Sequence, residues 1–290
     1  MRTSGGLREL VWPKSKEAEF VHRKTKRKRE AELASAHVRS LLRRQADREK
    51  ALRILEFGSG DGFQIPFLKR LGSVIASDVY FSRAMFQQQR EVVFLKSDIT
   101  RAPFRNSYFD MVYSNHVMEH IPDLTRAFEE LKRIGTPDCV YAFAVPTNVW
   151  LLLTIPAQYL AKTQRLVRYV FGGYSDQEKS AISDASDLFE QPDEEVKDPR
   201  HRLLRFPLPQ GHGVHQRFGD CFSCFKIRRW RRLFESSELH VRSVFPLLLY
   251  GPSEWPLIPT TEAFNKIGIC SSVLFILEKR DSRTDVKKSS

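Results

Sequence analysis

The sequence predicts an α/β fold in which seven strands, mostly parallel, form one doubly wound sheet covered by helices. Three observations lead to this prediction. Short apolar runs alternate with helix-forming stretches from residue 53 onward, a pattern typical of parallel sheets. A glycine-rich turn follows the first apolar run, and acidic residues end the next two. The length of 290 residues suffices for one large domain with an elaboration.

The expected elements follow one another in a regular order. The first strand is stopped by Gly58 and the first helix by Gly72. Asp123 is placed to cap the helix that follows the fourth strand. Strands are predicted at 53–57, 74–78, 92–95, 110–113, 139–145, 241–250 and 269–278, and helices at 65–71, 81–90, 123–133 and 227–239.

Residues 1–50 are predicted to form a basic helical segment ahead of the α/β domain. Residues 1–53 carry 16 Lys and Arg against seven Asp and Glu, and 14–50 contain neither Gly nor Pro. The basic run 22–29 is typical of an RNA-binding arm or a nuclear localisation signal. A solvated helix face is an equally good alternative. Apolar residues at helical spacing indicate packing on the domain that follows: Leu33, Ala34, Val38, Leu41 and Leu42.

Residues 147–215 interrupt the alternation and are predicted to be a cap or insertion within the domain 51–290. The apolar stretch 149–157 is followed by basic residues, so 149–170 either covers the site or lies against a membrane surface. No apolar run reaches the ~18 residues of a membrane span. With four cysteines and no signal-peptide core, we expect a cytoplasmic protein, with peripheral membrane contact as the alternative.

Three successive strand ends carry residues suited to bind a nucleoside. Glu56 is followed by a turn containing Gly58 and Gly60, which lets the backbone bend tightly and approach a ligand. Asp78 ends the second strand, where a carboxylate can accept hydrogen bonds from both ribose hydroxyls. Asp98 ends the third strand, where it can meet the exocyclic amine of adenine. All these positions share the carboxyl edge of the sheet, where open α/β sheets bind ligands.

The segment 55–62, LEFGSGDG, resembles the glycine-rich motif of class I S-adenosylmethionine-dependent methyltransferases, in the broad subgroup that includes the ubiquinone- and sterol-type enzymes. Segments 97–110 and 114–121 are similar to the next two signatures of that family. The resemblance implies a Rossmann-like fold, with S-adenosylmethionine as the cofactor. It also implies Glu56 on the methionine part, Asp78 on the ribose and Asp98 near the adenine. The expected cofactor-binding residues are Glu56, Gly58, Gly60, Asp78, Val79, Asp98, Ile99 and Asn115.

A nicotinamide-dependent dehydrogenase is the alternative enzyme for this fold. Its fingerprint is G-x-G-x-x-G, whereas this turn has Phe63 at the sixth position. Asp61 within the turn would also repel a pyrophosphate. S-adenosylmethionine carries no phosphate, so the turn favours the methyltransferase.

Two histidines after the fourth strand, His120 and His116, are the candidate catalytic bases. A hydroxyl acceptor needs a base, and histidine suits neutral pH, although a packing role is the commoner one for either residue. The nucleophile motifs of DNA and protein arginine methyltransferases are absent. We therefore expect transfer to an oxygen or nitrogen of a small molecule, lipid or glycan. The alternative is an RNA-binding or non-catalytic methyltransferase-fold protein that acts through segment 14–50.

A zinc site is a further alternative for the histidines and cysteines near residue 215. His212, His215, Cys221 and Cys224 have the spacing H-x2-H-x5-C-x2-C. The loop between the two pairs is shorter than in ordinary zinc modules. We therefore expect a substrate-side loop here and no metal.

Overall fold

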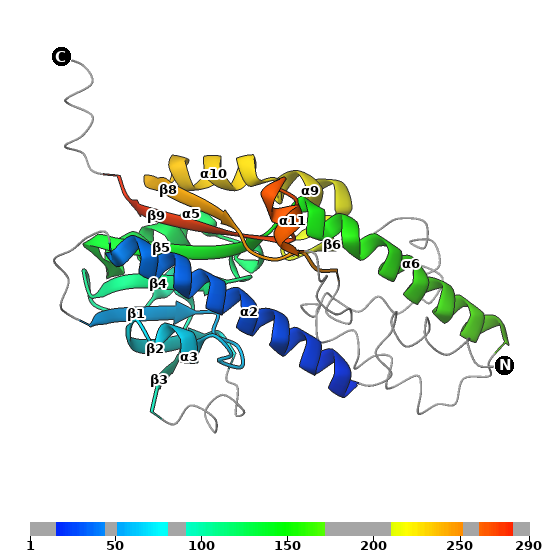
Figure 1. Cartoon of the computed structure of the whole chain (residues 1–290), viewed down its shortest axis with the longest axis horizontal. Helices are drawn as coiled ribbons and strands as arrows, with labels where there is room; N and C mark the ends of the chain where they lie inside the picture. Colours follow the sequence, from blue (N-terminus) through cyan, green and yellow to red (C-terminus); the bar gives the residue numbers. More distant parts are fainter. Residues whose placement is uncertain (1–15, 44–50, 81–90, 172–209, 252–260, 281–290) are drawn as a thin grey trace, which may run out of the picture.

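The computed structural model describes residues 16–43, 51–80, 91–171, 210–251 and 261–280. Its main feature is a seven-stranded sheet with the order β3-β2-β1-β4-β5-β9-β8 (Figure 1). Strands β1 to β5 pair in parallel, and β9 runs antiparallel to both of its neighbours. The strands are β1 (Leu52–Phe57), β2 (Gly72–Asp78), β3 (Val93–Lys96), β4 (Phe109–Asn115), β5 (Gly135–Pro146), β8 (Leu239–Pro246) and β9 (Ser272–Lys279). The predicted fold class is confirmed.

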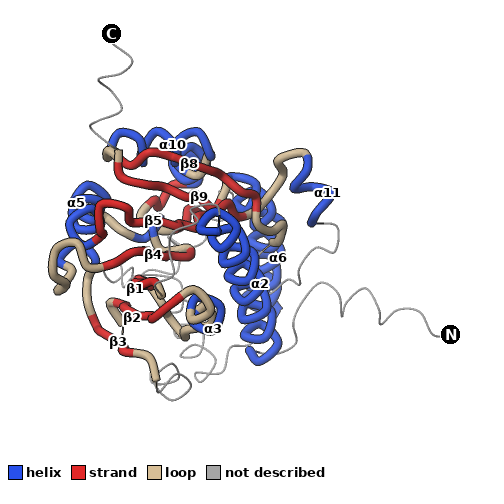
Figure 2. Tube along the Cα trace, turned by 60° about the vertical axis from the view of Figure 1, so that its left-hand side comes forward, coloured by secondary structure: helices blue, strands red, loops and turns tan. Residues whose placement is uncertain are grey.

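Helices cover both faces of this sheet (Figure 2). On one face, Phe128 of α5 (Leu124–Ile134) and Phe234 of α10 (Ile227–Ser236) join a buried cluster with Phe143 of β5. On the other face, Val38 of α2 (Lys16–Arg43) belongs to a cluster with Ala142 of the same strand. Successive residues of β5 thus point to opposite faces, as strand geometry requires. Both faces are apolar because both are buried.

The strand order reverses between β1 and β4, and this position determines where the site lies. β2 and β3 lie on one side of β1, while β4, β5, β9 and β8 lie on the other. In open α/β sheets the crevice at such a reversal, outside the carboxyl ends of the strands, is where ligands bind. The turn after β1 and the loop after β4 therefore meet at this crevice.

Most predicted elements are present, with changed ends. Asp123 caps α5 as expected, because its carboxylate accepts a 2.9 Å hydrogen bond from the backbone N–H of Arg126. The helix expected at 65–71 is shorter: α3 spans Ile65–Leu68, and its chain turns directly into β2 at Gly72. The strand expected at 241–250 ends at Pro246 in the structure. The helix expected at 81–90 lies outside the described residues.

The described parts of the expected insertion are mostly helical. Helix α6 (Asn148–Phe171) contains the apolar stretch. A hairpin of β6 (Gln210–His212) and β7 (His215–Arg217) follows, and then α9 (Phe218–Cys224). The acidic stretch between α6 and β6 lies outside the described residues. None of the described helices is long and apolar enough to cross a membrane.

Helix α2 is packed into the molecule along part of its length. Ala31, Ala34 and Val38 are fully buried, in agreement with the helical spacing of its apolar residues. Its basic run also turns inward: Lys26 is 5% exposed, and the neighbouring Glu30 is fully buried. The basic segment is therefore not a uniformly solvated arm, since part of it forms a wall of the crevice.

Candidate functional site

The turn after β1 has the backbone geometry that its glycines permit. Gly58 and Gly60 have φ values of +69° and +51°, in the left-handed region that favours glycine. A Cβ atom at Gly58 would collide with the side chain of Val117, in the loop after β4. The turn is held by a 2.8 Å hydrogen bond from the Gly60 N–H to Oδ2 of Asp78. Glycine at position 58 thus brings the turn and the loop after β4 into direct contact.

Glu56, next to this turn, is a buried carboxyl group. It is 1% exposed, and neither of its oxygens has a hydrogen-bond partner within the described chain. Burial, with a smaller contribution from the negative charge of Asp78, raises the pKa of Glu56 to about 8. Such a group is costly to bury without a partner. It is suited to receive a cationic or hydrogen-bond-donating ligand group.

The other expected cofactor residues lie at the same edge of the sheet, and they differ in their hydrogen bonds and in their exposure. The second oxygen of Asp78 accepts a 2.9 Å bond from the Tyr80 N–H. Asp98 caps a short 3-10 helix, η1 (Ile99–Arg101), through the Thr100 N–H. Val79 is 47% exposed, whereas Ile99 is buried in the core.

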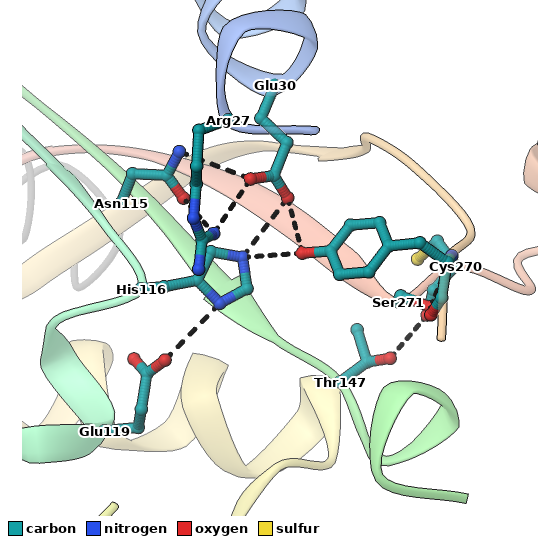
Figure 3. Close-up of polar contacts among 9 residues, drawn as sticks. Arg27, Glu30, Asn115, His116, Glu119, Thr147, Cys270 and Ser271 are labelled. Atoms are coloured by element: carbon teal, nitrogen blue, oxygen red, sulfur yellow. Dashed lines mark hydrogen bonds and ion pairs between the residues drawn. The ribbon is translucent and has the colours of Figure 1, made fainter. Parts of the chain in front are cut away.

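The expected cofactor residue Asn115 lies in a polar cluster beneath α2 (Figure 3). Its side-chain oxygen accepts a 3.3 Å hydrogen bond from Arg27. Its amide nitrogen lies 3.4 Å from Glu30. The cluster thus ties the end of β4 to the N-terminal helix.

His116, the next residue, is the centre of this cluster. It has a φ of +56°, which is uncommon for a residue other than glycine and is found preferentially at functional sites. Its Nε2 is 3.2 Å from Glu30 and 2.9 Å from the hydroxyl of Tyr250. Its Nδ1 is 3.4 Å from Glu119. Tyr250 donates a 2.7 Å hydrogen bond to Glu30 as well.

Each charged group of this cluster shifts the pKa values of its neighbours toward their charged forms. Burial would raise the pKa of Glu30, but the positive charges of His116 and Arg27 outweigh it and lower the pKa below its ordinary value. Burial and Arg27 lower the pKa of His116, but Glu30 and Glu119 outweigh them and raise it. The pKa of Glu119 falls to about 2, since its interactions with His116 outweigh burial. His116 therefore lies between two carboxylates that favour its protonated form.

A pocket of about 110 Å³ lies beside this cluster. Its walls come from α2, the loop after β4, the start of α6, the β6–β7 hairpin and the segment after β8. The residues that form it are Arg23, Lys26, Arg27, His116, Glu119, His120, Trp150, His212, Tyr250 and Gly251. The pocket adjoins the glycine turn. Arg23 of the pocket wall lies 3.9 Å from Asp61 of the turn, and Val117, which follows His116 of the pocket wall, contacts Gly58.

The β6–β7 hairpin brings a further histidine into the pocket. Its Val214 N–H donates a 3.1 Å hydrogen bond to the Glu119 carbonyl. Gly213 has a φ of +65°, and a Cβ there would collide with that same carbonyl. The hairpin is thereby seated on the loop after β4, with the His212 ring centroid 4.8 Å from that of His120.

His120 and His212 differ from the buried His116 in their surroundings. His120 is exposed to the pocket. Burial lowers the pKa of His212 to about 4, so this ring is neutral at physiological pH. The rings of His212 and Trp150 lie 4.8 Å apart. Trp150, near the start of the apolar helix α6, is thus part of the pocket wall.

The four residues of the possible zinc site differ from the group of potential metal ligands that the structure brings together. Among the described residues, Glu119, His120 and His212 each place one potential ligand atom within 4.8 Å of the others. The two cysteines do not take part. The Cys221 thiol contacts the backbone of His212 and His215 instead.

Sequence reasoning identified His116, His120 and Asn115 but not their partners. Glu30 lies 86 residues from His116 along the chain, and Tyr250 lies 134 residues from it. The one available signal for Glu30 was its position one turn ahead of the buried Ala34. An acidic residue on the buried face of a helix requires a charged or hydrogen-bonding partner.

Comparisons with known proteins agree with this geometry. Residues 55–143 match the model of a family described as a methyltransferase domain. The malonyl-[acyl-carrier protein] O-methyltransferase of Pectobacterium atrosepticum is 31% identical over 123 residues, which are 41% of this chain and 49% of that protein. The chain thus spans about half the length of this curated relative.

Solved structures with a similar chain path include two methyltransferases. A SAM-dependent methyltransferase from Aquifex aeolicus aligns over 82% of this chain and 87% of its own, with 12% identity and a TM-score of 0.44. The 1,6-didemethyltoxoflavin-N1-methyltransferase of Burkholderia thailandensis aligns over 87% of this chain and 79% of its own, with 13% identity and a TM-score of 0.48.

Proposed function

We propose that this chain is an S-adenosylmethionine-dependent methyltransferase, because residues 55–143 match the model of a methyltransferase domain. The observation that carries the proposal is the buried Glu56 carboxyl group beside the glycine turn, which has no hydrogen-bond partner among the described residues. The α-ammonium group of the cofactor provides the cation that this carboxyl group lacks. The residues present therefore fit the cofactor.

Three parts of the carboxyl edge would hold the cofactor. Glu56 would bind the methionine ammonium, and Asp78 would accept hydrogen bonds from the ribose hydroxyls. Asp98 would lie near the adenine, with Val79 and Ile99 flanking the base. Gly58 and Gly60 keep side chains out of the turn, where the cofactor approaches the backbone. When bound, S-adenosylmethionine supplies an electrophilic methyl group on a sulfonium.

The pocket beside the turn is the acceptor site in this proposal. Its residues position the acceptor and exclude water, which is the principal contribution of a protein to such a displacement. His120 and His212 are the residues placed to take a proton from a hydroxyl or amine acceptor. His116 is held between Glu30 and Glu119, so in this proposal it positions the loop after β4.

The acceptor is proposed to be an oxygen or nitrogen of a small molecule, or of a lipid or glycan small enough to enter the pocket. One fact supports an oxygen: the relative from Pectobacterium atrosepticum is named for O-methylation.

Calorimetry with S-adenosylhomocysteine tests the proposal directly. The compound should bind one site per chain and raise the melting temperature, since a ligand that binds only the native state stabilises it. NAD should do neither. Binding of NAD in the absence of S-adenosylhomocysteine binding would overturn the assignment.

A further inference from the structure

Glu119 resembles Glu56 in being a buried carboxyl group without a hydrogen-bond partner. Among the described residues, these are the two carboxyl groups whose buried oxygens make no hydrogen bond. Glu119 is 3% exposed. Nδ1 of His116 lies 3.4 Å from Oε1 of Glu119, without the alignment of a hydrogen bond (Figure 3). An ionised carboxylate has about four lone-pair sites, so Glu119 can accept a further ligand. The proposed function assigns Glu56 to the cofactor ammonium and leaves Glu119 without a ligand.

Two histidines place a ring nitrogen near this carboxylate. One potential ligand atom from each of Glu119, His120 and His212 lies within 4.8 Å of the others. All three side chains line the pocket. In a tetrahedral metal site with bonds of about 2.1 Å, the ligand atoms are about 3.4 Å apart. A small side-chain rotation would therefore bring the three groups to ligand distance, and His120 is exposed to the pocket and has room to rotate.

The position of His212 is fixed by the hairpin that carries it. The Val214 N–H donates a 3.1 Å hydrogen bond to the carbonyl of Glu119, the residue that also supplies the carboxylate. The His212 ring packs on Trp150 at a centroid distance of 4.8 Å. His116 contacts the Glu119 carboxylate and is itself held by the polar cluster beneath α2. Partners of this kind behind the ligands are typical of metal sites, because they orient the ligands.

The ligand types determine which ions fit. Two imidazoles and one carboxylate suit zinc and related transition-metal ions. Mg²⁺ and Ca²⁺ are instead bound mainly by oxygen ligands. Cationic side chains also line the pocket, namely Arg23, Lys26 and Arg27, and they disfavour an ion that is held by charge alone. Three protein ligands leave a fourth position open, as in catalytic zinc sites. Since all three ligands line the pocket, the open position would lie within it.

We propose that Glu119, His120 and His212 bind a divalent transition-metal ion, with zinc as the best-suited ion, and that its open position takes a hydroxyl oxygen of the acceptor. This ligand set shares only His212 with the four residues considered from the sequence.

The second part of the proposal rests on the proposed function and deepens it. The ion would lower the pKa of the acceptor hydroxyl, as zinc does for bound water, so that the proton passes to water. The oxygen would then form its bond to the methyl carbon as the carbon–sulfur bond breaks, and the electron pair of that bond stays on sulfur. His120 and His212 would thus act through the ion rather than as bases themselves.

Metal titrations of the full chain, dialysed beforehand against a chelator, test the site. Calorimetry should show one Zn²⁺ bound per chain and no saturable binding of Mg²⁺. Absence of zinc binding would overturn the proposal. Equal affinity for the two ions would also overturn it, because it would show that the histidine nitrogens do not take part.

Cobalt tests the ligands and the open position. Bound Co²⁺ should give visible absorption bands without the intense near-ultraviolet band of thiolate ligands. A thiolate band would place the ion on cysteines and overturn the ligand assignment. Acetohydroxamate, a small oxygen chelator, should shift the visible bands, since an open position accepts an oxygen ligand. A spectrum unchanged by acetohydroxamate would overturn the acceptor part of the proposal.

Matched variants locate the ion. His120→Gln and His212→Gln should each weaken zinc binding at least about tenfold, since loss of a partner behind a ligand alone costs about 10- to 100-fold. The control His215→Gln alters a histidine of the same hairpin that is not in the proposed ligand set. It should change zinc affinity less than about twofold. Equal losses in His212→Gln and His215→Gln would overturn the proposal. His120→Gln carries the test if His212→Gln does not fold, because His120 is exposed.

S-adenosylhomocysteine affinity, measured on the same samples, separates the failure of this inference from that of the proposed function. If the wild type binds S-adenosylhomocysteine but no zinc, the metal inference alone fails. If it binds zinc but no S-adenosylhomocysteine, the proposed function fails and the acceptor part of the inference fails with it, while the metal site stands.

Discussion

Glu56 is a carboxyl group whose charge should change when the cofactor binds. Its pKa of about 8 keeps it largely protonated at pH 7 in the free chain. An ammonium group beside it favours the ionised form, so binding should release a proton. Calorimetry in two buffers of different ionisation enthalpy should report close to one proton released at pH 7. Zero release would contradict the assignment of Glu56 to the cation.

Glu56→Gln is the corresponding variant. The amide cannot ionise, so proton release should disappear. Affinity for S-adenosylhomocysteine should fall roughly 10- to 150-fold, the effect of losing a hydrogen bond to a charged group. The free variant should melt at a higher temperature than wild type at pH 8, where the buried carboxyl group is costly. Lower stability at that pH would show that Glu56 already has a partner in the free chain.

Asp78 has two roles, and a conservative variant separates them. Its oxygens accept bonds from Gly60 and Tyr80, so alanine would disturb the turn as well as the ribose site. Asp78→Asn keeps one acceptor oxygen. It should weaken S-adenosylhomocysteine binding by roughly 10-fold or more while leaving the circular dichroism spectrum unchanged. Unchanged affinity would place the ribose elsewhere.

Single residues could be predicted from the sequence where they lie at the ends of predicted strands. Glu56, Asp78 and Asp98 were predicted because parallel strands bring their carboxyl ends to one edge. Glu30 and Tyr250 were not predicted, since they are 220 residues apart and meet only through packing. The prediction of His116 as a base did not include Glu30 and Glu119, two buried carboxylates that raise its pKa in the fold.

Among the elements, the β6–β7 hairpin has a position that depends on a single glycine. Any side chain at Gly213 would collide with the Glu119 carbonyl and would also require a strained φ. Gly213→Ala should therefore displace the hairpin and separate His212 from His120. We expect at least a tenfold loss of methyl transfer, the scale of losing a positioned catalytic group, with S-adenosylhomocysteine binding retained. Gly219→Ala is the control, since no atom lies within 4 Å of an added Cβ there.

The hairpin was not predicted because its strands have three residues each. Such short strands carry too little alternation to be recognised. The helices and long strands were predicted because their periodic patterns extend over whole elements. The burial of Lys26, in the basic run of α2, was not predicted for a different reason. Burial of a lysine depends on partners from other elements.

For the whole molecule, buried groups among the described residues make stability depend on pH. Glu30 and Glu119 have lowered pKa values, so the stability they contribute is present above about pH 4.5 and is lost as pH falls. His116 has a raised pKa, so its contribution is complete below about pH 6.5 and is lost as pH rises through the folded-state pKa. Glu56 holds its proton in the folded state up to about pH 8. Its presence therefore lowers stability as pH rises above 4.5.

The lowered pKa of His212 makes stability rise between about pH 4 and 6.5, which offsets the effect of Glu56 over that range. Together these effects predict a free chain that is most stable between about pH 5 and 6.5 and loses stability on both sides. Urea unfolding at a series of pH values measures this curve. Glu30→Gln should flatten the acid side, and it should lower stability at pH 6 by several kcal/mol because Arg27 and His116 lose their shared counter-charge. Glu56→Gln should flatten the alkaline side only. S-adenosylhomocysteine should extend the stable range upward, since it favours ionised Glu56. A wild-type curve that rises steadily from pH 5 to 9 would contradict the raised pKa values of both His116 and Glu56.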